Sequence, residues 1–206
     1  MKNINIPIVR YIVIIFGIFI LLSCSSTTQL ENEWSDKSYK KEGFKKVLIF
    51  GMATKPWKKK VFENEFRTAF KKYNIEAVSA WEELPEDEEL NKETFEIYFR
   101  DQNIDAVLVA METGMSTKET MYGGGTSFVA VGFYGFYVST SPVYQVPGYL
   151  SEETIIYMDT KLFETTEGKL VWSATSQSYE PKTTSDVIKA VSYIVVDQLY
   201  AEDFIH

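Results

Sequence analysis

The sequence predicts an α/β sandwich, with a mixed sheet of about five strands and three helices in the order β-α-β-α-β, long loop or hairpin, β-β-α. Three observations predict it. Short apolar runs alternate with segments of helical periodicity in the first half of the body. Two alternating segments around a glycine turn follow, and an apolar stripe at helical spacing closes the chain. The alternation favours right-handed crossovers with helices packed on a sheet.

The first strand is predicted over residues 46–53, where Val47, Leu48, Ile49 and Phe50 form a short apolar run bounded by Gly51. The helix that follows has an apolar face at helical spacing, with Glu63 and Arg67 paired at i,i+4 and expected on the solvent side. That apolar face consists of Val61, Phe62, Phe66, Ala69, Phe70 and Tyr73.

Residues 76–81 predict a second short strand, and the acidic turn 82–89 around Pro85 leads to a second helix. This helix carries Phe95, Tyr98 and Phe99, and residues 106–111 predict the third strand. The acidic residues of the turn lack the ligand and glycine spacing of a calcium loop, so the turn is interpreted as solvated and not as a metal site.

A β-hairpin is predicted from residues 154–164 and 169–177, with Gly168 at its corner. The alternation in its first strand places Ile156, Met158 and Leu162 on one face. The last helix begins at about Ser185, with Asp186 in its first turn. Its buried stripe is Val187, Val191, Ile194, Val195 and Leu199.

The N-terminus has the composition of a cleavable signal peptide. Lys2 and Arg10 are the only charges before Cys24, and the apolar run 11–22 is too short for a helix that needs about 20 residues to span a bilayer. The apolar run ends in a sequence that resembles a lipobox, in which the cysteine receives the lipid: Leu21, Leu22, Ser23 and Cys24. We therefore expect a lipoprotein signal peptide at 1–23, a lipidated flexible tether at 24–42 and a single α/β domain at 43–206, anchored by lipid on Cys24.

Composition and motifs exclude several classes of function. The 29 acidic residues outnumber the 21 basic ones, which disfavours nucleic-acid binding. The only histidine is the terminal His206 and the only cysteine is Cys24, so the sequence offers no Ser-His or Cys-His pair and no His/Cys metal cluster. Neither a metal nor a cofactor is expected. One basic cluster could bind a phosphate or lipid head group, but an ordinary solvated loop is the favoured interpretation. The cluster consists of Lys55, Lys58, Lys59 and Lys60.

Residues 121–150 contain no charged side chain, although 24% of the chain is charged. One interpretation is a long hairpin that folds back over the sheet as structural cover. The other is an exposed aromatic surface for a partner, an envelope polymer or a bilayer. The candidate partner-binding residues are Tyr122, Phe128, Phe133, Tyr134, Phe136, Tyr137 and Tyr144.

The order of elements and the lipobox, together with Leu162, Phe163 and the run 168–173, resemble a group of bacterial envelope lipoproteins. The group includes the curli-secretion lipoprotein and the lipoprotein activator of penicillin-binding proteins, and its fold is similar to the TolB N-terminal domain. The resemblance implies a membrane-anchored, non-catalytic binding or assembly module whose partners are the membrane, through the lipid, and an envelope protein or polymer.

The alternatives are an oligomeric secretion-pore subunit that uses a 121–150 hairpin and, less favoured, an enzyme that depends on carboxylates. The aromatics at Phe133, Tyr134, Phe136 and Tyr137 fall on both faces of such a hairpin, whereas a pore wall needs a polar lumen side. Ser25 after the lipidated cysteine resembles lipoproteins sent to the outer membrane, which implies a location facing the periplasm.

Overall fold

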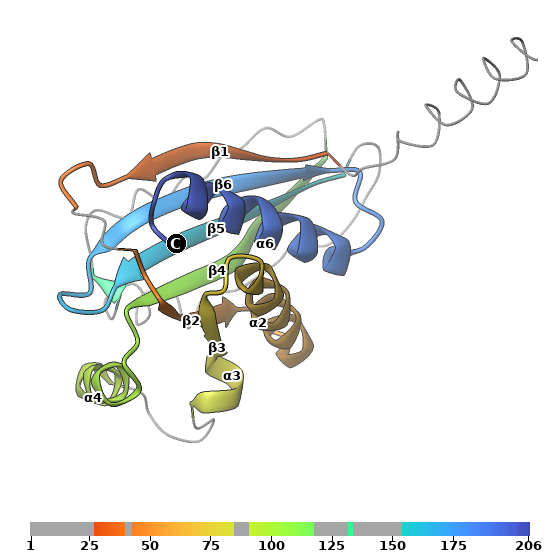
Figure 1. Cartoon of the computed structure of the whole chain (residues 1–206). Helices are drawn as coiled ribbons and strands as arrows, with labels where there is room; N and C mark the ends of the chain where they lie inside the picture. Colours follow the sequence, from red (N-terminus) through yellow and green to blue (C-terminus); the bar gives the residue numbers. More distant parts are fainter. Residues whose placement is uncertain (1–26, 40–42, 85–90, 118–131, 134–153) are drawn as a thin grey trace, which may run out of the picture.

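The computed structural model describes residues 27–39, 43–84, 91–117, 132–133 and 154–206. These residues form one six-stranded mixed sheet in the order β1-β6-β5-β4-β2-β3, with helices on both faces (Figure 1). The predicted α/β class is confirmed, with a somewhat larger sheet. The strands are β1 (Thr27–Ser35), β2 (Lys46–Met52), β3 (Glu76–Ser79), β4 (Ala106–Thr117), β5 (Thr154–Glu164) and β6 (Leu170–Tyr179). The helices are α2 (Pro56–Lys71), α3 (Ala80–Glu83), α4 (Lys92–Gln102) and α6 (Thr184–Ala201).

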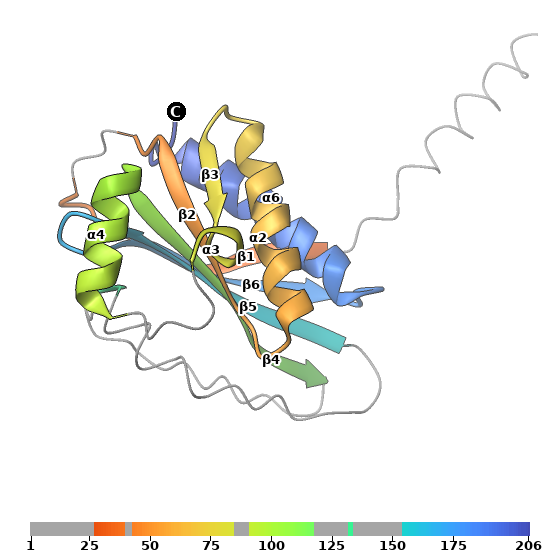
Figure 2. The same ribbon diagram turned by 90° about the horizontal axis from the view of Figure 1, so that it is seen from below.

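The parallel part of the sheet has β2 between β3 and β4. The chain passes from β2 through α2 to β3 on one side, then through α4 to β4 on the other side of β2. Two crossovers of the same hand that run in opposite directions put their helices on opposite faces. Figure 2 shows this result, with α4 on one face of the sheet and α2 and α6 on the other.

Helix α2 begins at Pro56, where the fixed φ of proline suits the first helical position. It packs very closely on β2 at Gly51, where a Cβ atom would lie 2.9 Å from the backbone oxygen of Lys59. Phe62, Phe66 and Phe70 are buried as predicted. Glu63 is buried too, which corrects the expectation that it lies in solvent beside Arg67.

The strand predicted over 76–81 ends at Ser79, and the chain then makes the single helical turn α3. The acidic turn predicted after it lies only partly in the described residues, since 85–90 fall outside them. Helix α4 begins after Asn91, whose side chain accepts a hydrogen bond from the Thr94 amide at 3.0 Å. It buries Phe95 and Phe99, as the sequence predicts.

The antiparallel part of the sheet consists of β4, β5, β6 and β1. The predicted hairpin is β5 and β6, and Gly168 at its turn has a φ of +69°, a conformation that favours glycine. Strand β1 was not predicted. It lies in the stretch 24–42, expected to be a flexible tether, but residues 27–35 pair with β6 instead.

Two apolar clusters form the core, one on each face of the sheet. The larger cluster lies under α2 and α6 and includes Trp172, whose indole Nε1 donates to Glu202 at 3.1 Å. The smaller cluster lies under α4 and joins β2, β4 and the end of β5. Phe204 and Ile205 are buried in the larger cluster, so the C-terminal residues before His206 are fixed to the body.

Candidate functional site

The uncharged segment 121–150 enters the described structure at Gly132 and Phe133 only. Phe133 is 3% exposed and belongs to the cluster under α4. Its ring centroid lies 5.1 Å from that of Phe95 and 5.7 Å from that of Phe163. Its backbone amide donates to the carbonyl of Gly168 at 2.8 Å. Phe133 is therefore a core residue, which corrects its assignment to a partner-binding surface.

The remaining aromatic candidates lie outside the described residues, as does the lipidation candidate Cys24. Those aromatics are Tyr122, Phe128, Tyr134, Phe136, Tyr137 and Tyr144. Their expected role in partner binding stays a prediction.

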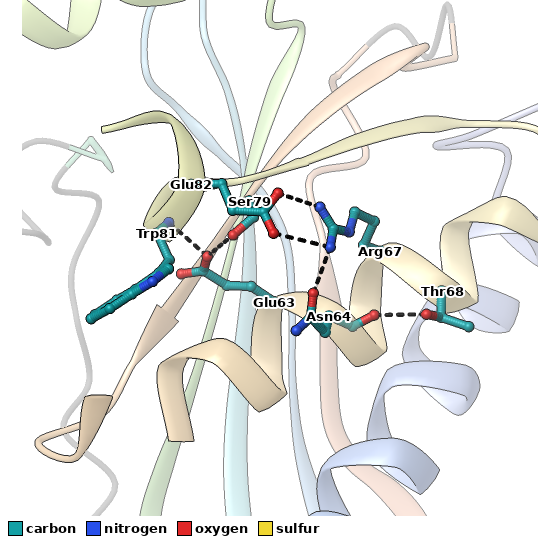
Figure 3. A network of polar contacts seen from close by, with 7 residues as sticks. All are labelled: Glu63, Asn64, Arg67, Thr68, Ser79, Trp81 and Glu82. Atoms are coloured by element: carbon teal, nitrogen blue, oxygen red, sulfur yellow. Dashed lines mark hydrogen bonds and ion pairs between the residues drawn. The ribbon is translucent and has the colours of Figure 1, made fainter. Parts of the chain in front are cut away.

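Glu63 is the most completely buried carboxylate of α2, with 2% exposure. Its Oε1 accepts the amide of Gly51 at 3.1 Å, and its Oε2 accepts the amide of Trp81 at 2.7 Å and the hydroxyl of Ser79 (Figure 3). Burial raises the pKa of Glu63, and the hydrogen bonds from Ser79, Trp81 and Gly51 oppose that rise. The carboxylate connects α2 to the ends of β2 and β3.

The other half of this network is exposed. The Arg67 guanidinium holds Glu82 in a bidentate pair, with Nη1 to Oε2 at 2.5 Å and Nη2 to Oε1 at 3.2 Å, and also donates to Asn64 at 2.6 Å (Figure 3). Both carboxylate oxygens of Glu63 accept hydrogen bonds from the protein itself. The hydrogen bonds and ion pairs of this network therefore hold α2 against α3. They give Glu63 a structural role and not a catalytic one.

The predicted basic cluster lies at the start of α2. The Lys58 ammonium pairs with Glu112 of β4 at 2.8 Å, and both side chains are largely buried. The Lys60 ammonium lies 4.7 Å from the ring centroid of Trp81. Two of the four lysines therefore have partners that composition could not identify, while Lys55 is exposed. The expectation of an ordinary solvated loop is only partly correct.

The face of β5, β6 and β1 that continues beyond Phe163 carries polar and tyrosine side chains. Register pairs Glu31 and Asp159 with Thr175, and Gln29 and Tyr157 with Gln177. Residues directly opposite one another in antiparallel strands share a face. We call this surface the polar strip: Gln29, Glu31, Tyr157, Asp159, Lys161, Thr175, Gln177 and Tyr179.

Hydrogen bonds between the strands and along β6 order the polar strip. Gln177 Nε2 donates to Glu31, Tyr179 donates to Gln177 Oε1 at 2.7 Å, and Thr175 donates to Asp159 at 2.8 Å. Within the described residues, the cluster under α4 contains no residue of β1, and of β6 only Leu170 packs against it. The strip is thus a partly exposed surface with amide, hydroxyl, carboxylate and ring groups, which could accept or donate hydrogen bonds to a polar partner.

Sequence reasoning missed the polar strip because β1 was not predicted. The signal available was the alternation in 170–179, where Thr175, Gln177 and Tyr179 share one face.

In the described residues, no group of three or more His, Cys, Asp or Glu side chains could hold a metal ion. No helix in that part of the chain has both the length and the apolar character needed to cross a membrane.

The described residues thus form an α/β domain with a polar, partly exposed sheet face. No protein-family model matches the sequence, and no curated protein matches it with significance. Among solved structures, the chain is similar to the PelC dodecamer from Paraburkholderia phytofirmans (TM-score 0.44, 13% identity, 82% of this chain and 96% of that chain). It is also similar to lipoprotein GNA1162 from Neisseria meningitidis (TM-score 0.38, 16% identity, 76% of this chain and 98% of that chain).

A PDZ domain protein from Parabacteroides distasonis is a third similar structure (TM-score 0.45, 11% identity, 90% of this chain and 39% of that chain). All three TM-scores are below 0.5 and all identities are below 25%, so these structures do not assign a function to this chain.

Proposed function

We propose that this protein is a lipid-anchored, non-catalytic binding or assembly module of the bacterial cell envelope. The observation that carries the proposal is the sequence before β1. Cys24 ends the apolar run 11–22 in the lipobox-like sequence Leu21, Leu22, Ser23, Cys24. The acyl groups on such a cysteine hold a protein stably in a membrane, because several chains bind where one binds only marginally.

The sheet begins very close to this anchor. Thr27, the first residue of β1, follows Cys24 by three residues. Three residues of extended chain reach at most about 11 Å. A lipid on Cys24 would therefore hold the domain itself near the membrane surface, with little freedom from a linker.

The polar strip is the surface we propose for partner binding. Its hydrogen-bonding side chains and tyrosine rings suit an envelope protein or polymer, and the acidic net charge of −8 disfavours nucleic acid. An outer-membrane location facing the periplasm is part of the proposal and derives from Ser25 after the cysteine.

The anchor is tested by mass measurement of the N-terminal peptide and by fractionation of cells that carry Cys24→Ser. The wild-type peptide should begin at Cys24 and carry acyl groups, and Cys24→Ser should leave the membrane fraction or retain the uncleaved segment. Ser25→Ala is the matched control and should stay acylated. An unmodified Cys24 in a membrane-free wild-type protein would refute the anchor.

The binding surface is tested by affinity capture from gently solubilised envelopes. A double variant, Tyr157→Ala with Gln177→Ala, should lose a partner that the wild type retains, because both side chains lie on the polar strip. Tyr200→Ala is the control, since Tyr200 is an exposed aromatic on α6. Equal capture by both variants would remove the polar strip from the proposal.

A pore subunit is the second candidate, favoured by one observation. β4 and β5 are antiparallel neighbours, with Thr117 opposite Thr154, so residues 118–153 connect adjacent strand ends as a hairpin would. Burial of Phe133 in the core counts against it, because two spanning strands of about 10 residues need their shared turn away from the body. Large homo-oligomers with ion conductance from the lipidated protein would support the pore, and monomers would exclude it.

A further inference from the structure

One end of the sheet carries both the chain that leads to Cys24 and the start of α2. Strand β1 is antiparallel to β6, β6 to β5 and β5 to β4, while β4 is parallel to β2. The first residue of β1 therefore lies at the same end as the last residues of β2, β4 and β6. Figure 1 shows the start of β1, the end of β6 and the start of α6 together at the right-hand end of the sheet. We call this the anchor-proximal end.

The exposed side chains at this end include aromatic, apolar and basic ones, which are the types that contact a membrane surface. Trp57, in the first turn of α2, is 48% exposed, although tryptophan is usually well buried. Lys55 precedes it, and Lys182 lies between β6 and α6; both are exposed. Met115 near the end of β4 is a further exposed apolar side chain.

Within the described residues, three acidic side chains at this end have partners. Glu112 pairs with Lys58 at 2.8 Å. Glu180 Oε1 accepts the amide of Thr154 at 2.8 Å, and Asp186 Oδ2 accepts the hydroxyl of Thr183 at 2.8 Å. Among the described residues, Lys55 and Lys182 form no ion pair with a carboxylate, so their ammonium groups can meet an anionic head group although the whole chain is acidic.

We infer that the anchor-proximal end rests directly on the bilayer, with the Trp57 ring in the lipid interface and the ammonium groups of Lys55 and Lys182 at anionic head groups. The inference rests on the proposed lipidation of Cys24. Tryptophan favours the membrane interface because its ring is apolar and its N–H is polar. Lysine side chains are attracted to anionic lipid over a distance of about one Debye length.

The short connection from Cys24 makes such a contact effective even where it is weak. A lipid within about 11 Å of β1 holds the surface at a high local concentration near the head groups. The contact would fix which way the polar strip points, because α2 and α6 begin at the membrane and the sheet extends away from it.

The experiment uses the full lipidated protein reconstituted in vesicles of phosphatidylcholine with phosphatidylglycerol, in which brominated lipid quenches tryptophan fluorescence. Trp57→Phe should remove most of the quenchable emission. Trp34→Phe is the matched control, because Trp34 is also 48% exposed but lies near the opposite end of β1. The control variant should keep the quenchable emission.

A second variant tests the head-group contact. Lys55→Glu together with Lys182→Glu should reduce the brominated-lipid quenching of Trp57 at least twofold in vesicles with phosphatidylglycerol. The same change should have a smaller effect in pure phosphatidylcholine, because the neutral head group carries no net charge for the lysines to meet.

The outcomes separate this inference from the proposed function. If the protein stays in the vesicles through its acyl groups but Trp57 is no more quenched than Trp34, the inference is wrong and the anchor stands. If the N-terminal peptide carries no lipid, the anchor fails on its own measurement. Protection of Trp57 from acrylamide without quenching by brominated lipid would assign this surface to a second protein molecule and overturn the inference.

Discussion

Glu63 shows how one buried carboxylate fastens three elements. It accepts hydrogen bonds from Gly51, Ser79 and Trp81, which belong to β2, β3 and α3. Glu63→Gln keeps the shape but replaces one accepting oxygen with an NH₂ group, so a buried amide loses its partner. We expect the free energy of unfolding to fall by about 1–3 kcal/mol at neutral pH, measured by urea denaturation.

The pH dependence of that loss follows from the pKa. Burial raises the pKa of Glu63 in the folded protein above the ordinary value of 4.5. A raised pKa means that the folded state binds the proton more tightly, so the stabilisation linked to that proton is full below the ordinary pKa of 4.5 and is lost as the pH rises through the folded pKa. The hydrogen bond that Glu63→Gln loses contributes at neutral pH as well. The stability advantage of the wild type over Glu63→Gln should therefore be greatest at low pH.

Phe133 gives the second prediction at the scale of the residue. Its ring contacts Phe95, Phe99 and Phe163 in the cluster under α4. Phe133→Ala should lower the free energy of unfolding by about 3–5 kcal/mol, because it leaves a cavity in a packed core. Trp34→Ala removes an even larger ring, but one that is 48% exposed, and should change the free energy of unfolding by less than about 1 kcal/mol. Equal effects in urea denaturation would contradict the placement of Phe133.

At the scale of the element, β1 makes a prediction that a flexible tether would not. Its amides pair with β6 from Thr27 to Ser35, and Leu30 packs against the larger core cluster. Hydrogen exchange of the protein should therefore find protected amides in 28–31, since ladder hydrogen bonds slow exchange. Leu30→Asp should remove that protection, while Gln29→Asp on the opposite face should keep most of it. Exchange of these amides within seconds in the wild type would instead support a flexible tether in this stretch.

At the scale of the whole molecule, the short connection between the proposed lipid on Cys24 and the sheet should matter for orientation. Insertion of about 12 Gly/Ser residues between Ser26 and Thr27 would leave lipidation intact but lengthen the connection several-fold. The effective concentration of Trp57 at the bilayer should fall, and its quenching by brominated lipid should fall with it. Membrane fractionation should stay unchanged. Unaltered quenching would mean that the Trp57 contact does not depend on the anchor distance.

The sequence by itself determined the α/β class, the β5–β6 hairpin, and helices α2, α4 and α6. Each rests on a local signal: an apolar period, a glycine at a turn, or a residue that starts a helix, such as Pro56. The lipobox-like run that ends at Cys24 is an equally local signal, and the lipid anchor that it indicates stays a prediction.

Only the tertiary structure decided the places of β1, Glu63 and Phe133. In β1, Leu30 and Trp34 are the only large apolar residues of Thr27–Ser35, so its pairing depends on the edge that β6 offers and not on its own pattern. Glu63 is tolerated in the core because the backbone amides of Gly51 and Trp81, which belong to other elements, donate hydrogen bonds to its carboxylate. Phe133 is buried because β5 and α4 supply the surrounding rings, and such contacts between distant residues leave no local signal in the chain.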